Sequence, residues 1–131
     1  MIIKGEEFVF HLNDKQYHCA MDITMDFIGG KWKSVVLWYL INKTLRFTEI
    51  KKRIPDMTEK MLSIQLKALE IDGLIKREVS GTKAPFKVEY SLTEFGKTII
   101  PVLKGIAKWG RDLGTSKGKM VSKSRHKSIA K

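Results

Sequence analysis

The chain has 131 residues, enough for one compact domain and little more. Hydrophobic residues make up 43% of it, an ordinary share for a globular protein, and no apolar run approaches the roughly 20 residues that a membrane span needs. The first residues become acidic at Glu6 and lack the long apolar region of a signal peptide. We therefore expect a cytoplasmic protein that does not span a membrane.

The chain is strongly basic, with a formal net charge of +11 from 25 Lys and Arg against 14 Asp and Glu. Such an excess suits a polyanionic partner, because each phosphate that is neutralised releases a condensed counterion. The charge is unevenly spread, since residues 117–131 hold six basic side chains and no acidic one. The remainder is only moderately basic, so charge favours nucleic-acid binding without indicating a fold.

Cysteine and histidine exclude several kinds of site. The single cysteine, Cys19, rules out an intramolecular disulfide and a Cys-based zinc finger. The histidines, His11, His18 and His126, show no metal-ligand spacing. We expect no metal and no cofactor.

The N-terminal third predicts a small β element and two helices. Residues 1–18 read as strand, turn and strand, with the turn at Asn13-Asp14. A helix is predicted from Asp22 to Ile28, where Gly29-Gly30 ends it. Residues 31–41 carry apolar side chains around most of the helix circumference, which predicts a central core helix.

A helix-turn-helix is predicted next. Thr48 is expected to cap a helix over residues 49–54, which Pro55 ends. Thr58 is expected to cap a fourth helix that runs to Asp72. Two helices joined by a short turn form the helix-turn-helix arrangement.

The hydrophobic period switches from helix to strand after Gly73. Residues 74–79 and 86–92 predict two strands joined by a loop, and in the second strand alternate residues from Phe86 to Leu92 share one face. A hairpin that follows the second helix of a helix-turn-helix is a wing. A last helix is predicted over residues 94–113, with a kink at Pro101.

The fourth helix has three faces at about 100° per residue. Leu62, Leu66 and Leu69 form a narrow apolar sector, Met61, Ile64, Ala68 and Ile71 form a second one beside it, and Glu59, Lys60, Ser63, Lys67 and Glu70 form a polar strip. A helix anchored on most sides, with lysine and serine on the remaining strip, suits insertion into a major groove. Taken alone, the lysines read more simply as solvated charges, and the preceding turn and following basic hairpin favour DNA.

The predicted DNA-binding residues are Lys31, Arg46, Lys51, Lys52, Thr58, Lys60, Ser63, Gln65, Lys67, Lys83 and Lys87. Lys60 and Ser63 are expected to reach base edges, and Gln65 to read adenine only if it faces the groove. The phosphate-binding candidates include Lys31, Arg46, Lys51 and Lys52. They are expected to set the register of the protein on the duplex without reading sequence. Lys83 and Lys87 are expected to follow the backbone or enter the minor groove.

Four stretches together resemble a known family. They are Asp26-Phe27-Ile28-Gly29-Gly30-Lys31-Trp32, Leu45-Arg46-Phe47-Thr48-Glu49-Ile50, Lys60-Met61-Leu62-Ser63 with Gln65-Leu66, Leu69-Glu70 and Asp72-Gly73-Leu74-Ile75, and Val88-Glu89-Tyr90-Ser91-Leu92-Thr93-Glu94-Phe95-Gly96. In this order they resemble the HxlR family of bacterial winged-helix regulators, which are relatives of the MarR type. The resemblance spans roughly Cys19 to Gly110.

The resemblance implies an α+β fold, mostly α, namely a winged helix-turn-helix with N- and C-terminal dimerisation helices. The expected domains are an N-terminal extension over residues 1–18, the winged-helix domain over residues 19–113 and a disordered basic tail over residues 114–131. It further implies a homodimer on a pseudo-palindromic DNA site and control of transcription, often repression. The expected dimer contacts are Met21, Met25, Ile99, Val102, Leu103, Ile106 and Trp109.

Family members often respond to oxidants or electrophiles through a cysteine just before the first helix, and Cys19 occupies that position. A thiol at a helix N-terminus also lies at the positive end of the helix dipole, which favours the reactive thiolate. Against this reading, Asp22 and Asp26 lie nearby in sequence, and free cysteines are usually buried spectators. The chain also departs from the family in having Cys19-Ala20 where Cys-Pro is common, and Ile64 where a polar residue is common.

Three other readings remain open. The winged helix is also compatible with a protein-assembly module, and the basic tail with a non-specific nucleic-acid-binding protein. A small-molecule effector is a further alternative. Trp32, Trp38, Tyr39, Trp109 and the methionines are candidates to line a pocket between the core and dimer helices, although core packing explains them more simply. Catalysis is not expected, because Gly29-Gly30 does not follow a strand as a phosphate-binding loop does, and no nucleophile with a base and an orienting partner stands out.

Overall fold

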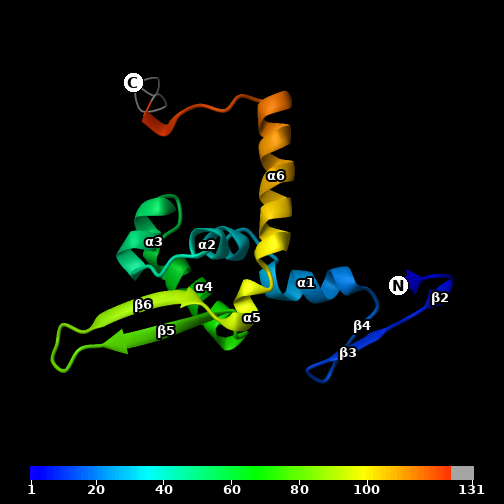
Figure 1. Ribbon diagram of the computed structural model, residues 1–131, viewed down its shortest axis with the longest axis horizontal. Helices are drawn as coiled ribbons and strands as arrows, with labels where there is room; N and C mark the ends of the chain where they lie inside the picture. The colour runs from blue at the N-terminus through cyan, green and yellow to red at the C-terminus, as the bar shows by residue number, and fades with distance from the viewer. Residues whose placement is uncertain (125–131) are drawn as a thin grey trace. The chain divides into compact units, whose positions relative to one another are not determined.

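The computed structural model describes residues 1–124. The chain forms two compact units, residues 1–98 and residues from 99 onward. The first unit contains strands β1 to β6 and helices α1 to α5, and the second contains helix α6 (Figure 1). None of the helices within residues 1–124 combines the length and the apolar character that crossing a membrane requires.

Two short hairpins open the chain. They consist of β1 (Ile2–Ile3) with β2 (Glu6–Glu7) and β3 (Phe10–Leu12) with β4 (Lys15–Tyr17). The second hairpin has the predicted turn, where Asn13 and Asp14 both take positive φ, as a tight two-residue hairpin turn requires. The first hairpin was not predicted. Its turn, Lys4-Gly5, also has positive φ at both residues, but Lys-Gly is a weaker turn signal than Asn-Gly or Asp-Gly.

The second hairpin is fastened to α1 (Ala20–Ile28) through one carboxylate. Asp26 on α1 accepts hydrogen bonds from Lys15 Nζ at 2.8 Å and from the Tyr17 hydroxyl at 2.6 Å. These two hydrogen bonds, first that of Lys15, lower the pKa of Asp26, and the same contacts raise the pKa of Lys15 and of Tyr17. Tyr17 is buried, so the N-terminal residues form part of the folded unit.

Helix α2 (Lys33–Tyr39) supplies part of the core. It is shorter at both ends than the predicted range of 31–41. Val36, Leu37 and the following Leu40 are buried, which confirms the predicted core helix. Trp38, however, is 41% exposed, so the apolar circumference is not buried all round.

The helix-turn-helix consists of α3 (Phe47–Arg53) and α4 (Glu59–Ile71). The predicted cap of α3 was wrong, because the helix begins one residue before Thr48 and has Arg46 at its N-cap position. Glu49 stabilises this end by accepting a hydrogen bond from the Arg46 backbone N–H at 2.8 Å. The predicted cap of α4 is confirmed, since Thr58 Oγ1 accepts from the Met61 backbone N–H at 3.1 Å.

The wing is the antiparallel pair β5 (Ile75–Ser80) and β6 (Lys87–Leu92), which projects beyond α3 and α4 in Figure 1. The ladder pairs Ile75 with Leu92 at its base and Ser80 with Lys87 at its tip. Leu45, just before α3, exchanges two backbone hydrogen bonds with Tyr90 on β6, at 3.0 and 2.8 Å. The predicted second strand began at Phe86, but β6 begins at Lys87, and Phe86 lies exposed just before it.

The predicted helix over residues 94–113 is divided. The chain forms α5 (Glu94–Lys97) and then α6 (Ile100–Ser116). Pro101 lies in the first turn of α6, where the missing backbone donor has no helical acceptor to lose, so it starts a helix and does not kink one. Helix α6 continues past the predicted boundary at residue 114, and residues 125–131 of the expected tail lie outside the described residues.

The base of the wing is held by Thr93, which joins β6 to α5. Its hydroxyl donates to the Gly73 carbonyl oxygen at 2.6 Å and accepts from the Gly96 backbone N–H at 2.8 Å. Gly96 lies so close to the Leu74 carbonyl group that an added Cβ would overlap with its oxygen. The segment that leads into β5 and the start of α5 are therefore in direct contact. The Thr93 hydroxyl bridges them, and Gly96 permits the close approach because it has no side chain.

Candidate nucleic-acid interface

Helix α4 is anchored by one face and exposed on the opposite one. Leu62, Leu66 and Leu69 are buried in the first unit, as predicted. The second apolar sector predicted for this helix is wrong in part, because Ile64 is 49% and Ile71 is 72% exposed. The outward face therefore consists of Lys60, Ile64, Lys67 and Ile71, with Ser63 beside it.

The base-reading candidates divide between this face and the flank of the helix. Lys60 and Ser63 are exposed, and within residues 1–124 neither side chain has a hydrogen-bond or ion-pair partner. Gln65 is half-buried, and its amide nitrogen donates to Met61 Sδ at 3.2 Å. Gln65 thus lies off the outward face, and the condition under which it was expected to read adenine is not met in this structure.

A cleft of about 190 Å³ separates α4 from the wing. It is lined by Ser63, Leu66, Lys67, Glu70, Arg77 and Tyr90. Sequence reasoning missed Arg77 as a binding residue, although a signal was present. Alternation along β5 puts Arg77 on the same face as Ile75, which is buried, and hence toward α4. Arg77 and Lys67 place two cations beside Glu70 in this cleft.

The phosphate-binding candidates differ in whether their side chains already have an intramolecular partner. Arg46 and Lys52 are exposed at the two ends of α3, and Lys83 is exposed in the loop of the wing. The other three have intramolecular partners: Lys51 Nζ donates to the Pro55 carbonyl oxygen at 3.1 Å, Lys31 Nζ lies 4.5 Å from the centre of the Trp32 ring, and Lys87 pairs with Glu89 at 3.6 Å. Arg46, Lys52 and Lys83 are therefore the most readily available cations of this set. Thr58 is engaged as the cap of α4.

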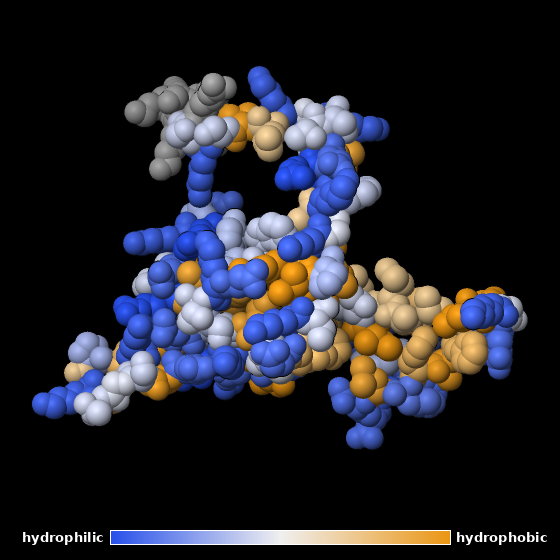
Figure 2. Space-filling view, viewed as in Figure 1, coloured by the Kyte–Doolittle hydropathy of each residue, from blue (hydrophilic) through white to orange (hydrophobic). Residues whose placement is uncertain are grey.

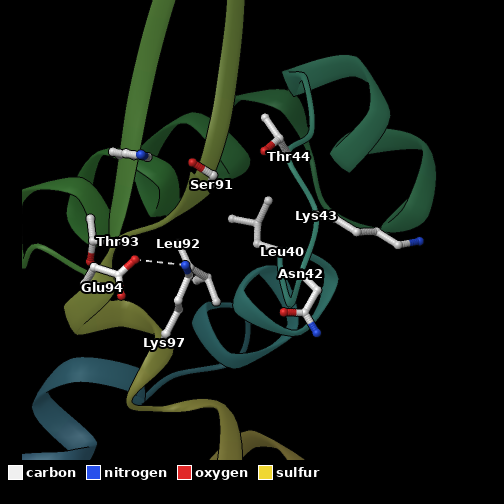
Figure 3. A pocket seen from close by; sticks show the side chains of 10 residues that line it. Leu40, Asn42, Lys43, Thr44, Ser91, Leu92, Thr93, Glu94 and Lys97 are labelled. Carbon is white, nitrogen blue, oxygen red and sulfur yellow. Dashed lines mark hydrogen bonds and ion pairs between the residues drawn. The ribbon is translucent and has the colours of Figure 1, made fainter.

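A larger cleft of about 510 Å³ lies between the segment after α2 and the base of the wing (Figure 3). Its apolar lining is limited to Leu40 and Leu92, and Lys97 forms an ion pair with Glu94 at 2.9 Å. In Figure 3 the Lys43 side chain points away from the cleft. None of the tryptophans that the sequence suggested for an effector pocket lines it.

The expected dimer residues are mostly exposed. On α1, Met21 and Met25 are exposed. Apolar side chains also gather over the two hairpins, at the right of Figure 2. The exposed apolar residues of the hairpins are Ile2, Ile3, Phe8, Val9 and Leu12. In the second unit, Val102, Ile106 and Trp109 of α6 are exposed, Trp109 to 71%. Ile99 is the N-cap residue of α6, and Leu103 lies within the helix.

Cys19 is the N-cap residue of α1. It is half-buried, its thiol is free, and it makes no capping hydrogen bond. Within residues 1–124, no three histidine, cysteine or acidic side chains come together in a way that would hold a metal ion. The structure thus leaves the thiol as a free group at the start of the first helix.

Comparison with known proteins identifies the family. Residues 27–117 match the HxlR-like helix-turn-helix family. An uncharacterised HTH-type transcriptional regulator of Methanothermobacter thermautotrophicus is 46% identical over 104 residues, which cover 79% of each chain. The HTH-type transcriptional regulator YdeP of Bacillus subtilis is 50% identical over 92 residues, covering 70% of this chain and 71% of YdeP.

A solved structure agrees with this match. The redox regulator HypR in its oxidised form superposes with a TM-score of 0.68 at 44% identity, covering 72% of this chain and 96% of HypR. The two curated relatives are HTH-type transcriptional regulators, the class of protein that the sequence predicted. With its helix-turn-helix, its wing and this match over residues 27–117, the chain belongs to the HxlR-like helix-turn-helix family of transcriptional regulators.

Proposed function

We propose that this protein is a sequence-specific repressor that acts in the cytoplasm and binds double-stranded DNA as a homodimer. The observation that carries the proposal is the outward face of α4, where Lys60 is exposed and unpaired opposite a buried leucine face, with Ser63 exposed and unpaired beside it. Exposed cations on α3 and the wing flank this helix. A rigid helix with free donors on its outer side suits a major groove, whose base edges offer acceptors.

The homodimer is supported by exposed apolar side chains on two helices. Met21 and Met25 on α1, and Val102, Ile106 and Trp109 on α6, expose large apolar groups that a monomer would leave in water. A two-fold dimer presents two copies of α4, which suit half-sites about one helical turn apart. A dimer that spans two successive grooves of a promoter competes with polymerase, which is why we propose repression.

The test is selection of bound duplexes from a random pool, followed by binding titrations at several salt concentrations. We expect a two-fold repeat that binds on the order of 10³-fold or more tightly than random duplex. Lys60→Ala is expected to change the preference at particular bases, whereas Lys83→Ala weakens all duplexes alike and lowers the salt slope by about 0.9.

The alternatives predict different results in the same titrations. A protein-assembly module would show neither sequence preference nor steep salt dependence. A tail-driven, non-specific binder would lose all binding when residues 118–131 are deleted. We expect that deletion to weaken affinity while the preference between sequences is retained.

We further propose that oxidants release the protein from DNA through Cys19. Support comes from the free thiol at the N-terminus of α1 and from the 44% identical redox regulator HypR. With one cysteine per chain, the two thiols of a dimer transfer two electrons to an oxidant, release two protons and form an intersubunit disulfide. A mixed disulfide with a small thiol and a sulfur oxyacid are the alternative products. Electrophiles would instead alkylate the thiolate sulfur.

The experiment compares Cys19→Ser with Met25→Leu, which removes an exposed oxidisable side chain on the same helix. The Cys19 variant is expected to bind DNA normally and to stay bound in diamide or a quinone. The Met25 variant should be released like the wild type. Release of the Cys19 variant by oxidant would disprove a role for this thiol, and non-reducing electrophoresis identifies the disulfide.

A further inference from the structure

Ile64 lies in the middle of the outward face of α4. At about 100° per residue, it points about 40° from Lys60, about 60° from Lys67 and about 170° from the mean direction of the three buried leucines. It is 49% exposed although isoleucine is a residue that proteins usually bury. The stripe that faces away from the core most directly is formed by Lys60, Ile64, Lys67 and Ile71.

A single exposed apolar side chain needs no explanation on its own. A binding role for Ile64 therefore depends on its position relative to the two lysines. With a rise of 1.5 Å per residue, Ile64 lies about 6 Å along the axis from Lys60 and about 4.5 Å from Lys67. A duplex that lies along this stripe therefore faces Ile64 as well as the two lysines. The flanking cations, together with Arg77 in the adjacent cleft, suit a polyanion and do not suit an apolar protein partner.

The major groove offers one apolar group on its base edges, the C5-methyl of thymine. We propose that Ile64 determines specificity by packing on a thymine methyl group in each half-site, next to the position read by Lys60. The inference rests on the proposed DNA-binding function and adds to it one base preference that does not depend on hydrogen bonds. A polar residue at this position would read a donor or acceptor, whereas isoleucine has neither.

The experiment uses the selected operator and replaces each thymine in turn by deoxyuridine, which lacks only the methyl group. We expect one position per half-site at which the replacement weakens binding by about four-fold, the effect of leaving one methyl group unburied, and by about 15-fold when both half-sites are changed. Ile64→Ala is expected to reduce this difference to less than two-fold. Base pairing and the hydrogen-bonding groups are the same in both duplexes.

Ile71→Ala is the matched control, because Ile71 is exposed on the same face at the C-terminal end of the helix, away from the N-terminal half that contacts bases. It should keep the full difference between thymine and deoxyuridine. Both variants should unfold at the wild-type temperature, since neither side chain is buried.

The outcomes separate the two proposals. If the wild type prefers its operator but tolerates deoxyuridine at every position, or if Ile64→Ala keeps the thymine preference, the role of Ile64 is overturned and the DNA-binding function stands. If the wild type shows no preference among duplexes, both proposals are overturned.

Discussion

Thr93 offers a sharp test of how the wing is fastened to the rest of the first unit. Thr93→Val preserves the shape of the side chain but removes the hydroxyl that donates to Gly73 and accepts from Gly96. Each partly buried, neutral hydrogen bond contributes about 0.5–1.5 kcal/mol, so the loss of two is expected to lower the free energy of unfolding by about 2 kcal/mol. For a chain of this size, that corresponds to a fall in Tm of about 8 °C.

The assay is urea and thermal unfolding followed by circular dichroism at one fixed protein concentration, because the Tm of the proposed dimer would depend on concentration. Thr93→Ser keeps the hydroxyl and should lose less than half as much stability. Thr98→Val makes the same chemical change at an exposed hydroxyl, which donates to the Phe95 carbonyl oxygen, and should stay within about 0.5 kcal/mol of the wild type. Equal losses for the valine and serine variants of Thr93 would refute the reasoning, as would a valine variant of wild-type stability.

Three further predictions concern the core, the hairpin anchor and the cleft. Leu69→Ala should lower the free energy of unfolding by about 2–5 kcal/mol in a urea titration, because Leu69 is completely buried on α4. Asp26→Asn should be less stable than the wild type above about pH 5. Since the pKa of Asp26 is lowered in the folded state, this difference should shrink as the pH falls below the ordinary value of about 3.9 and vanish below the folded pKa, which urea titrations at pH 7, 5 and 3 measure. Arg77→Ala should weaken binding to all duplexes alike and lower the salt slope by about 0.9, measured by anisotropy at several salt concentrations; a changed base preference would contradict a phosphate contact.

The strongly periodic and capped parts of the fold were predictable from the sequence. Helix α4 was found with its cap at Thr58 because a capping threonine, a leucine repeat and a terminal glycine agree on the same boundaries. The wing followed from a switch of hydrophobic period after Gly73. The family was predictable as well, because the resemblance depends on the order of several such elements along one sequence.

The predictions from the sequence were wrong where short elements or tertiary contacts determine the structure. The cap of α3 was misplaced by two residues, since Thr48 has a better capping propensity than Arg46 but Glu49 satisfies the backbone from within the helix. Pro101 was read as a kink because sequence alone does not show that a new helix begins one residue earlier. The exposed side of Ile64 was missed because periodicity identifies apolar sectors without showing which of them has a neighbour.

The backbone hydrogen bonds between Leu45 and Tyr90 have a consequence for the spacing of the proposed DNA contacts. They join strand β6 of the wing to the segment that leads into α3, and so restrict motion of the wing relative to the helix-turn-helix. In the proposed complex, the offset between the bases that α4 touches and the phosphates that the wing touches is then the same at every operator. Natural operators should consequently vary in the length of the spacer between half-sites more readily than in the length of a half-site.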